Sequence, residues 1–188
     1  MKKIFIILIL MATTFVACDD DEQFWEIGNF NLQFLDKNGT PVSADSTNTP
    51  QLYIYMEFNP VYSAILKSNT DLIQKAYAAS PQGDYIGLKH SISKLIITSN
   101  NDFNGIKAGE DISSKLVYCG QASTTQNCAN ITISNFIFNE LKQEQPVLYS
   151  ATFRFTEKPV RAKHKFTFRF IDSQGKEFVS STKEIIWK

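Results

Sequence analysis

Apolar and polar residues alternate along several short segments of this chain, a pattern typical of β-strands that bury one face. Residues 51–59, QLYIYMEFN, place four apolar side chains on one side: Leu52, Ile54, Met56 and Phe58. Residues 26–36, EIGNFNLQFLD, space their apolar side chains in nearly the same way: Ile27, Phe30, Leu32 and Phe34. The alternation continues in residues 92–99, 114–118 and 148–156. It predicts a mainly β protein.

The C-terminal residues 165–188, KFTFRFIDSQGKEFVSSTKEIIWK, predict a β-hairpin. Phe166, Phe168 and Phe170 would face one way along the first strand. Residues 172–175, DSQG, supply a turn, because glycine at the last turn position tolerates a positive φ. The return strand is expected to run to Trp187.

The residues between Asn59 and Gly83 do not show this alternation and predict a helix. Apolar residues recur there at helical spacing, with possible caps at Ser68 and Asn69, a stop at Pro81, and a short turn starting at Asn59-Pro60. The segment NFIFNELK, residues 135–142, fits a strand or a helix.

Many short strands with turns between them, plus one helical excursion, favour an immunoglobulin-like antiparallel β-sandwich. We expect one domain over residues 24–188, and 13 of the chain's 15 phenylalanines lie in this range, enough to fill its core. The alternative is two small β domains with a break near residues 101–115.

The N-terminus reads as a signal peptide over residues 1–17. Lys2 and Lys3 precede 14 mostly apolar residues, IFIILILMATTFVA, which end in small residues. This run is shorter than the roughly 20 apolar residues that span a bilayer, and two threonines interrupt it.

Residues 15–18, Phe15-Val16-Ala17-Cys18, resemble the lipobox of bacterial lipoproteins. In that motif a diacylglycerol is attached to the cysteine thiol, and the cysteine becomes the acylated N-terminus. Two or more acyl chains hold a protein stably on a bilayer, at about 0.8 kcal/mol per buried CH₂. The resemblance implies that Cys18 anchors the mature chain to a membrane, with residues 18–23 as an acidic tether.

Four acids follow the cysteine: Asp19, Asp20, Asp21 and Glu22. They can serve as a solvated spacer, because anionic headgroups repel them. CDDDE also resembles the acidic lipoprotein export signal of Bacteroidetes, which sends proteins to the outer face of the outer membrane. An Asp directly after the lipidated cysteine resembles, in enterobacterial-type sorting, an inner-membrane retention signal. Four acids in succession favour export.

The whole chain resembles small surface lipoproteins of Bacteroidetes that are catalogued as domains of unknown function. The features responsible are CDDDE, the central LIITSNNDFNGIKAGEDI and the ending FTFRFIDSQGKEFVSSTKEIIW. The resemblance implies an outer-membrane location, facing the exterior, and a sandwich fold. It carries no catalytic residues to this chain.

Two cysteines remain after Cys18, and Cys119 and Cys128 bracket the polar loop CGQASTTQNC. In an oxidising compartment such a pair predicts a disulfide. The alternative, a zinc site, lacks further ligands nearby. Without the two leader lysines, 17 of the 19 basic residues remain against 19 acidic ones, so the charge excludes a typical nucleic-acid binder.

The motifs of common catalytic and cofactor sites are missing from the sequence, including HExxH, G-x-S-x-G, the Walker loop and G-x-G-x-x-G. His90 and His164 are expected at the surface. Residues 98–112 contain oxygen ligands that calcium accepts, but without EF-hand spacing, and turn formation explains them better. Paired carboxylates can assemble from anywhere in a fold, so glycosidase chemistry stays open. We predict no catalytic residues, no metal, no cofactor and a protein that is not an enzyme.

Aromatic side chains offer flat faces for sugar rings, and the candidates are Trp25, Tyr53, Tyr55 and Trp187. At alternate strand positions such residues more often pack in a core or on a sheet face. We therefore predict a lipid-anchored envelope protein that acts in binding. The alternatives are a glycan-binding accessory subunit of an outer-membrane uptake system and a structural or adhesive subunit that contacts envelope proteins.

Overall fold

The computed structural model describes residues 22–43, 45–47, 49, 51–65, 85–121, 128–142, 146–159 and 162–188. In this part the chain is mainly β, as the alternation predicts. The signal peptide, Cys18 and the acids Asp19 to Asp21 lie outside the described residues. Most of the helix predicted between Asn59 and Gly83 lies outside them as well.

The described strands form three sheets. The largest has the order β4-β1-β3-β8-β6-β7, with β1 Glu22–Leu35, β3 Tyr53–Ile65, β4 Tyr85–Leu88, β6 Leu116–Gly120, β7 Ile131–Thr132 and β8 Ser150–Phe155. The second has the order β11-β10-β5, with β5 Ile92–Ser99, β10 Phe166–Asp172 and β11 Glu177–Ser181. The third has the order β2-β12-β9, with β2 Ser46–Thr47, β9 Lys163–His164 and β12 Ile185–Trp187.

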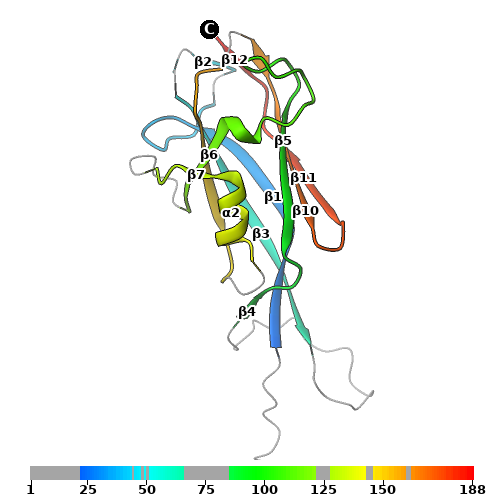
Figure 1. Cartoon of the computed structure of the whole chain (residues 1–188). Helices are drawn as coiled ribbons and strands as arrows, with labels where there is room; N and C mark the ends of the chain where they lie inside the picture. The colour runs from blue at the N-terminus through cyan, green and yellow to red at the C-terminus, as the bar shows by residue number, and fades with distance from the viewer. Residues whose placement is uncertain are drawn as a thin grey trace, which may run out of the picture.

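Most neighbouring strands run antiparallel, whereas β4 pairs parallel with β1, and β2 with β12. Figure 1 shows the long strands β1 and β3 running side by side to the lower end of the molecule. The small third sheet and the C-terminus lie at the upper end (Figure 1). The first residue of β1 and the last residue of the chain are therefore at opposite ends.

The predicted strand faces are confirmed in β1, in β3 and in the residue just before β3. Ile27, Phe30 and Phe34 are buried, and so are Leu52, Ile54, Met56 and Phe58. They belong to one hydrophobic cluster that also includes residues from β5, β6, β8, β10 and β12. Tyr53 points to the opposite face and packs in a smaller cluster with Leu35 and Cys119.

Aromatic rings join the six-stranded sheet to β10 of the second sheet. Ring centroids are 5.2 Å apart for Phe30 and Phe170, and 4.9 Å apart for Phe155 and Phe166. Such pairs contribute about 0.5–1.5 kcal/mol beyond the burial of their area. The second sheet therefore packs against the six-stranded sheet through aromatic rings.

The turn predicted at Asn59-Pro60 is wrong, because β3 continues through both residues to Ile65. A register shift at Gly28 accommodates this stretch: Pro60 lies opposite Ile27, and Asn59 opposite Asn29. A β-carbon at Gly28 would lie 2.7 Å from the Asn59 carbonyl oxygen. The absent side chain thus allows the close approach that keeps the two strands paired around a proline.

The C-terminal hairpin is confirmed for its first part, in which β10 pairs with β11 around the turn at Gly175, φ 81°. The return strand does not continue to Trp187 as predicted. It ends at Ser181, after which Thr182 exchanges two hydrogen bonds with the backbone of Phe166. The chain then leaves the second sheet, and β12 pairs with β2 and β9.

The ambiguous segment NFIFNELK belongs mostly to a helix, α2, which spans Ile133–Glu140. The Thr132 hydroxyl accepts a hydrogen bond from the Asn135 N–H at 3.2 Å and caps the first turn. Phe136 is buried and Phe138 is 62% exposed. In a strand these two rings would share a face, so their opposite burial follows from the helix.

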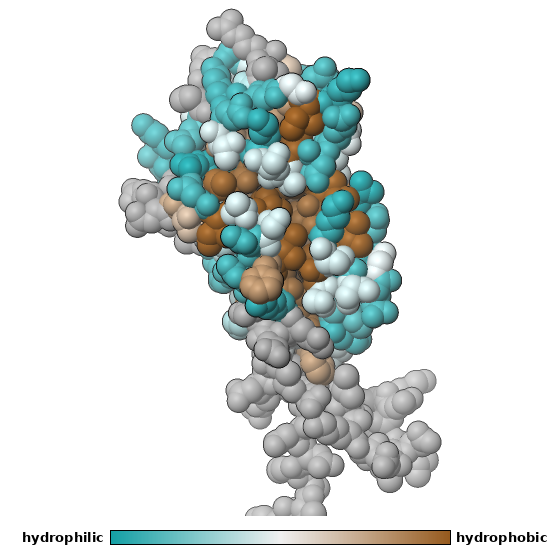
Figure 2. All heavy atoms as spheres, in the orientation of Figure 1, coloured by the Kyte–Doolittle hydropathy of each residue, from teal (hydrophilic) through white to brown (hydrophobic). Residues whose placement is uncertain are grey.

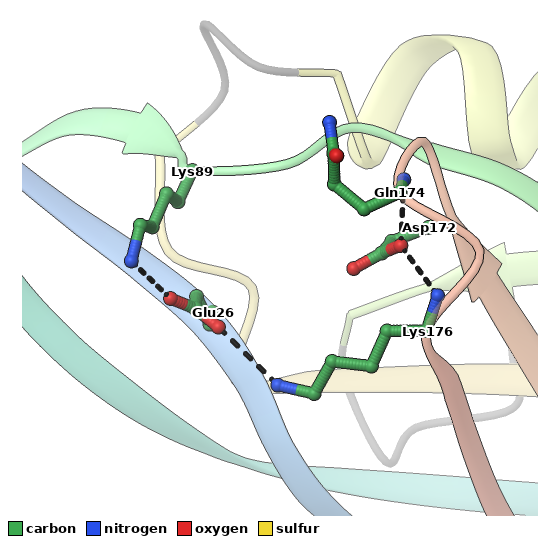
Figure 3. Close-up of polar contacts among 5 residues, drawn as sticks. All are labelled: Glu26, Lys89, Asp172, Gln174 and Lys176. Atoms are coloured by element: carbon green, nitrogen blue, oxygen red, sulfur yellow. Dashed lines mark hydrogen bonds and ion pairs between the residues drawn. The ribbon is translucent and has the colours of Figure 1, made fainter.

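Glu26 on β1 connects three parts of the fold through its carboxylate (Figure 3). It forms ion pairs with Lys89, 2.8 Å away just after β4, and with Lys176, 3.4 Å away between β10 and β11. In the same view Asp172 accepts hydrogen bonds from the backbone N–H groups of Gln174 and Lys176 and orders that turn. The hydrogen bond from Lys89 is the main cause that holds the pKa of Glu26 below its ordinary value of 4.5.

We predict that Glu26→Gln lowers the free energy of unfolding by up to about 1 kcal/mol near neutral pH. Because the folded-state pKa of Glu26 is lowered, its contribution is complete above the unfolded pKa and is lost as pH falls through the folded value. Urea unfolding of both proteins between pH 3 and pH 7 measures this, with Glu57→Gln, an exposed glutamate on β3, as the control. A stability difference that persists unchanged below about pH 3.5 would contradict the role of the ion pairs.

Candidate functional site

Three of the four aromatic candidates for sugar binding are in the interior. Trp25 and Trp187 are 0% and 1% exposed, and Tyr53 is also buried. Tyr55 is half-buried on β3. The core interpretation is therefore correct for the two tryptophans and Tyr53, and these residues form no platform for a ligand.

The surface position predicted for His164 is wrong, because its side chain is fully buried. Its Nδ1 atom lies 2.9 Å from the Ser99 hydroxyl, and its ring stacks on Phe166. A serine beside a histidine also occurs in hydrolases, but Ser99 is buried too, so a substrate does not reach this pair. His90 is half-buried. Lys163 and Lys165 flank His164 in the sequence, and these charged residues are the reason that a surface position was expected.

The oxygen-rich segment of residues 98–112 uses its carboxylates to order loops. Asp102 accepts a hydrogen bond from the Ala108 N–H at 2.9 Å. One oxygen of Asp111 accepts from the N–H groups of Ser113, at 2.9 Å, and Ile97, at 3.3 Å. These bonds agree with turn formation. Among the described residues, no group of three or more His, Cys, Asp or Glu side chains is arranged to hold a metal ion.

A groove of about 480 Å³ between β5 and α2 is the candidate binding site. One wall is formed by Ser91 and the start of β5, residues 92–95, and the other by residues of α2 and the two residues that follow it. Its apolar lining consists of Ile92, Leu95, Ile133, Ile137, Phe138 and Leu141. Figure 2 shows apolar residues along the space between α2 and β5, with hydrophilic residues on both sides. The volume is in the range of ligand pockets, about 300–1,000 Å³.

Strand β5 lies at the edge of its sheet and faces this groove with its unpaired side. On that side the Ile97 carbonyl accepts a hydrogen bond from the Ile112 N–H at 2.7 Å. The Ile92 N–H donates to the Leu141 carbonyl at 3.3 Å. Alternate residues of an antiparallel strand direct their backbone groups to the same edge, so Leu95 directs its N–H and C=O away from β10 as Ile97 does.

The polar groups of the groove carry more positive than negative charge. Lys94 and Lys142 line it together with Asp111, whose Oδ1 already accepts two backbone hydrogen bonds. The Lys142 ammonium lies 3.5 Å from the centre of the Phe138 ring, a cation–π contact. The remaining polar lining is serine: Ser91, Ser93, Ser113 and Ser134. The site can thus bind a ligand that is partly apolar and partly anionic.

The disulfide supports the helical wall of the groove. Cys119 on β6 is bonded to Cys128, three residues before β7, in agreement with the sequence prediction. The Ala129 N–H also donates to the Cys119 carbonyl at 3.2 Å, and β7 then pairs with β6 and leads directly into α2. Below α2, burial raises the pKa of the Tyr118 phenol, so this ring stays neutral in the core.

We predict that Cys119→Ser/Cys128→Ser lowers the free energy of unfolding by about 2.7 kcal/mol, the chain-entropy value for a loop of this length. Chemical unfolding of the wild type and the double variant measures the change. Dithiothreitol is the control, because it should destabilise the wild type by a similar amount and leave the variant unaffected. Equal stability of the wild type with and without reductant would contradict a stabilising disulfide.

Comparison of the chain with protein-family models, with curated proteins and with solved structures gives no match. Among the described residues, no helix is long and apolar enough to cross a membrane. The predicted lipidation site and export signal, Cys18 and Asp19 to Asp21, lie outside these residues, and Glu22 begins β1. The leader sequence and the groove are therefore the features of this chain that bear on its function.

Proposed function

We propose that this protein is a lipid-anchored protein of the outer membrane that faces the cell exterior and acts by binding, without catalysis. The observation that carries the proposal is the leader of residues 1–17 with the lipobox-like sequence that ends at Cys18. The acids Asp19 to Glu22 support export to the outer face. The groove between β5 and α2 supports a binding role.

The position at which β1 starts limits the distance between the domain and a membrane to which Cys18 is anchored. β1 begins at Glu22, inside the segment predicted as a tether, and only three residues separate Glu22 from Cys18. Four extended residues span at most about 14 Å. In this proposal the end of the molecule with Glu22 and Ile65 lies close to the bilayer. The groove would lie farther out, and the small third sheet would be most distant (Figure 1).

A glycan-binding role is the second candidate, and two exposed tyrosines favour it. Tyr62 on β3 and Tyr149 just before β8 are 40% and 57% exposed, and their hydroxyls are 3.1 Å apart. Such rings can stack on a sugar and hydrogen-bond to it. A structural or adhesive role would use the exposed edge of a sheet. Loss of oligosaccharide binding in Tyr149→Ala, measured by calorimetry, would favour the glycan role, and absence of binding by the wild type would exclude it.

We also propose that the sheets form an immunoglobulin-like sandwich. The aromatic contacts between β10 and the strands β1 and β8 support this arrangement, with β11-β10-β5 as one layer and the six-stranded sheet as the other. A crystal structure in which β10 hydrogen-bonds to β8 within one sheet would contradict it.

The anchor is tested by labelling cells with an alkynyl fatty acid and treating them with an external protease. We expect the wild type to be labelled and degraded while a periplasmic marker stays intact, and we expect Cys18→Ala to carry no label. A variant in which Asp19, Asp20, Asp21 and Glu22 are changed to Ala should keep the label and resist the protease. An unlabelled wild type would exclude the anchor, and a labelled but protected one would exclude the exterior location.

The orientation is tested with a fluorophore at Val61→Cys or at Ile186→Cys, both exposed positions. Val61 pairs with Glu26 near the start of β1, whereas Ile186 is in β12 at the opposite end. We expect spin-labelled lipid headgroups to quench the fluorophore at position 61 more strongly, because the short tether holds that end near the bilayer. Equal quenching at both positions would contradict an end-on arrangement.

A further inference from the structure

We propose that the groove between β5 and α2 binds an extended peptide segment of another protein, which pairs with the free edge of β5 at Leu95. The peptide would insert an apolar side chain between the strand and the helix and place an acidic residue near Lys94 and Lys142. This inference rests on the proposed binding role and names the class of its partner.

The edge of β5 is occupied on both sides of Leu95. Toward the end of the strand, Asp111 and Ile112 bind the N–H and C=O of Ile97, and the Gly109 N–H donates to Ser99. Toward its start, Ile92 is bound to Leu141. Outside the ladder with β10, the described residues supply no hydrogen-bond partner for the outward groups of Leu95. The open length from Ile92 to Ile97 is about 16 Å, which fits a short extended segment.

The outward backbone N–H and C=O of Leu95 are shielded from solvent, so a hydrogen bond to them is more stabilising than one at an open sheet edge. Leu95 is 2% exposed, and it lines the groove together with apolar residues of α2. Backbone groups in such surroundings gain more from a hydrogen bond than groups in open water. Strand addition supplies one N–H and one C=O at the correct spacing, and alternate side chains of the added strand enter pockets beside the edge.

The helical wall and the charges define the side chains of the peptide. Ile133 and Ile137 on α2 face the groove, and the exposed Phe138 stands at its rim. An apolar side chain of the peptide would be covered by these residues. Two lysines, Lys94 and Lys142, line the groove against one carboxylate, Asp111, so the net charge of the lining is positive. An acidic residue is therefore favoured beside the apolar one.

The test uses the full chain, immobilised through a C-terminal tag in detergent, and a phage library of random dodecapeptides. We expect peptides with an apolar and an acidic residue to be enriched over beads without the protein. For the best peptide, Phe138→Ser and Lys94→Glu should each raise Kd about tenfold, the equivalent of about 1.4 kcal/mol. The matched controls Val179→Ser, exposed on the other edge strand of the sheet, and Lys107→Glu, exposed on a loop, should leave Kd unchanged.

Hydrogen exchange on the wild type tests strand pairing without any substitution. In the free protein the Leu95 N–H should exchange faster than the N–H of Lys94 and Ile96, which face β10 in the ladder. Saturating peptide should slow exchange at Leu95 and have little effect on the other two. Peptide that binds without protecting the Leu95 N–H would overturn the proposal.

Three further results would also overturn it: no enriched peptide, equal binding by the groove variants, or another occupant. Binding of dodecanoate or maltohexaose that Phe138→Ser abolishes would assign the groove to acyl chains or glycans instead. Dimerisation that Phe138→Ser abolishes would assign it to a second copy. The outcome is independent of fatty-acid labelling, so a failed anchor and a failed peptide site are distinguishable.

Discussion

The aromatic contacts between β10 and the six-stranded sheet are the interaction on which the rest of the structure depends. Phe166, Phe168 and Phe170 project from one face of β10, and their rings meet rings from β1, β3 and β8. These contacts position β10, and β10 in turn holds β5 through its antiparallel ladder. The strand that forms one wall of the groove is thus positioned by core contacts of its neighbour β10, and Ile92 and Leu95 of β5 belong to the same hydrophobic cluster.

The other wall depends on local features of the chain between β6 and β8. The disulfide and the β6–β7 pairing return the chain to the large sheet, and the Thr132 cap starts α2 immediately afterwards. Phe136 then packs against Tyr118, with ring centroids 4.5 Å apart. Because strand, disulfide and helix follow within a few residues, the helix has little freedom to move relative to β6, and the groove is preformed.

The sequence predicts the strands whose buried and exposed residues alternate. It does not predict positions that depend on contacts between distant parts of the chain. The alternation in β1, β3 and β10 was sufficient because each strand has one face in the core. The return strand after β11 could not be placed, because Thr182 closes the hairpin on Phe166 only in the folded sheet. His164 was expected at the surface, since nothing in RAKHKF indicates the aromatic rings that surround it.

The groove itself was not predictable from the sequence. It arises because other parts of the chain cover the edge of β5 on both sides of Leu95 and leave it open at that residue. Exposed edges invite pairing with other chains, and proteins usually cover them or interrupt them. In β5 the covering is nearly complete, from Asp111 and Ile112 on one side and Leu141 on the other. The part left open at Leu95 lies beside α2, and Leu95 is 2% exposed. In the proposed peptide complex, one added strand would complete the covering of this edge.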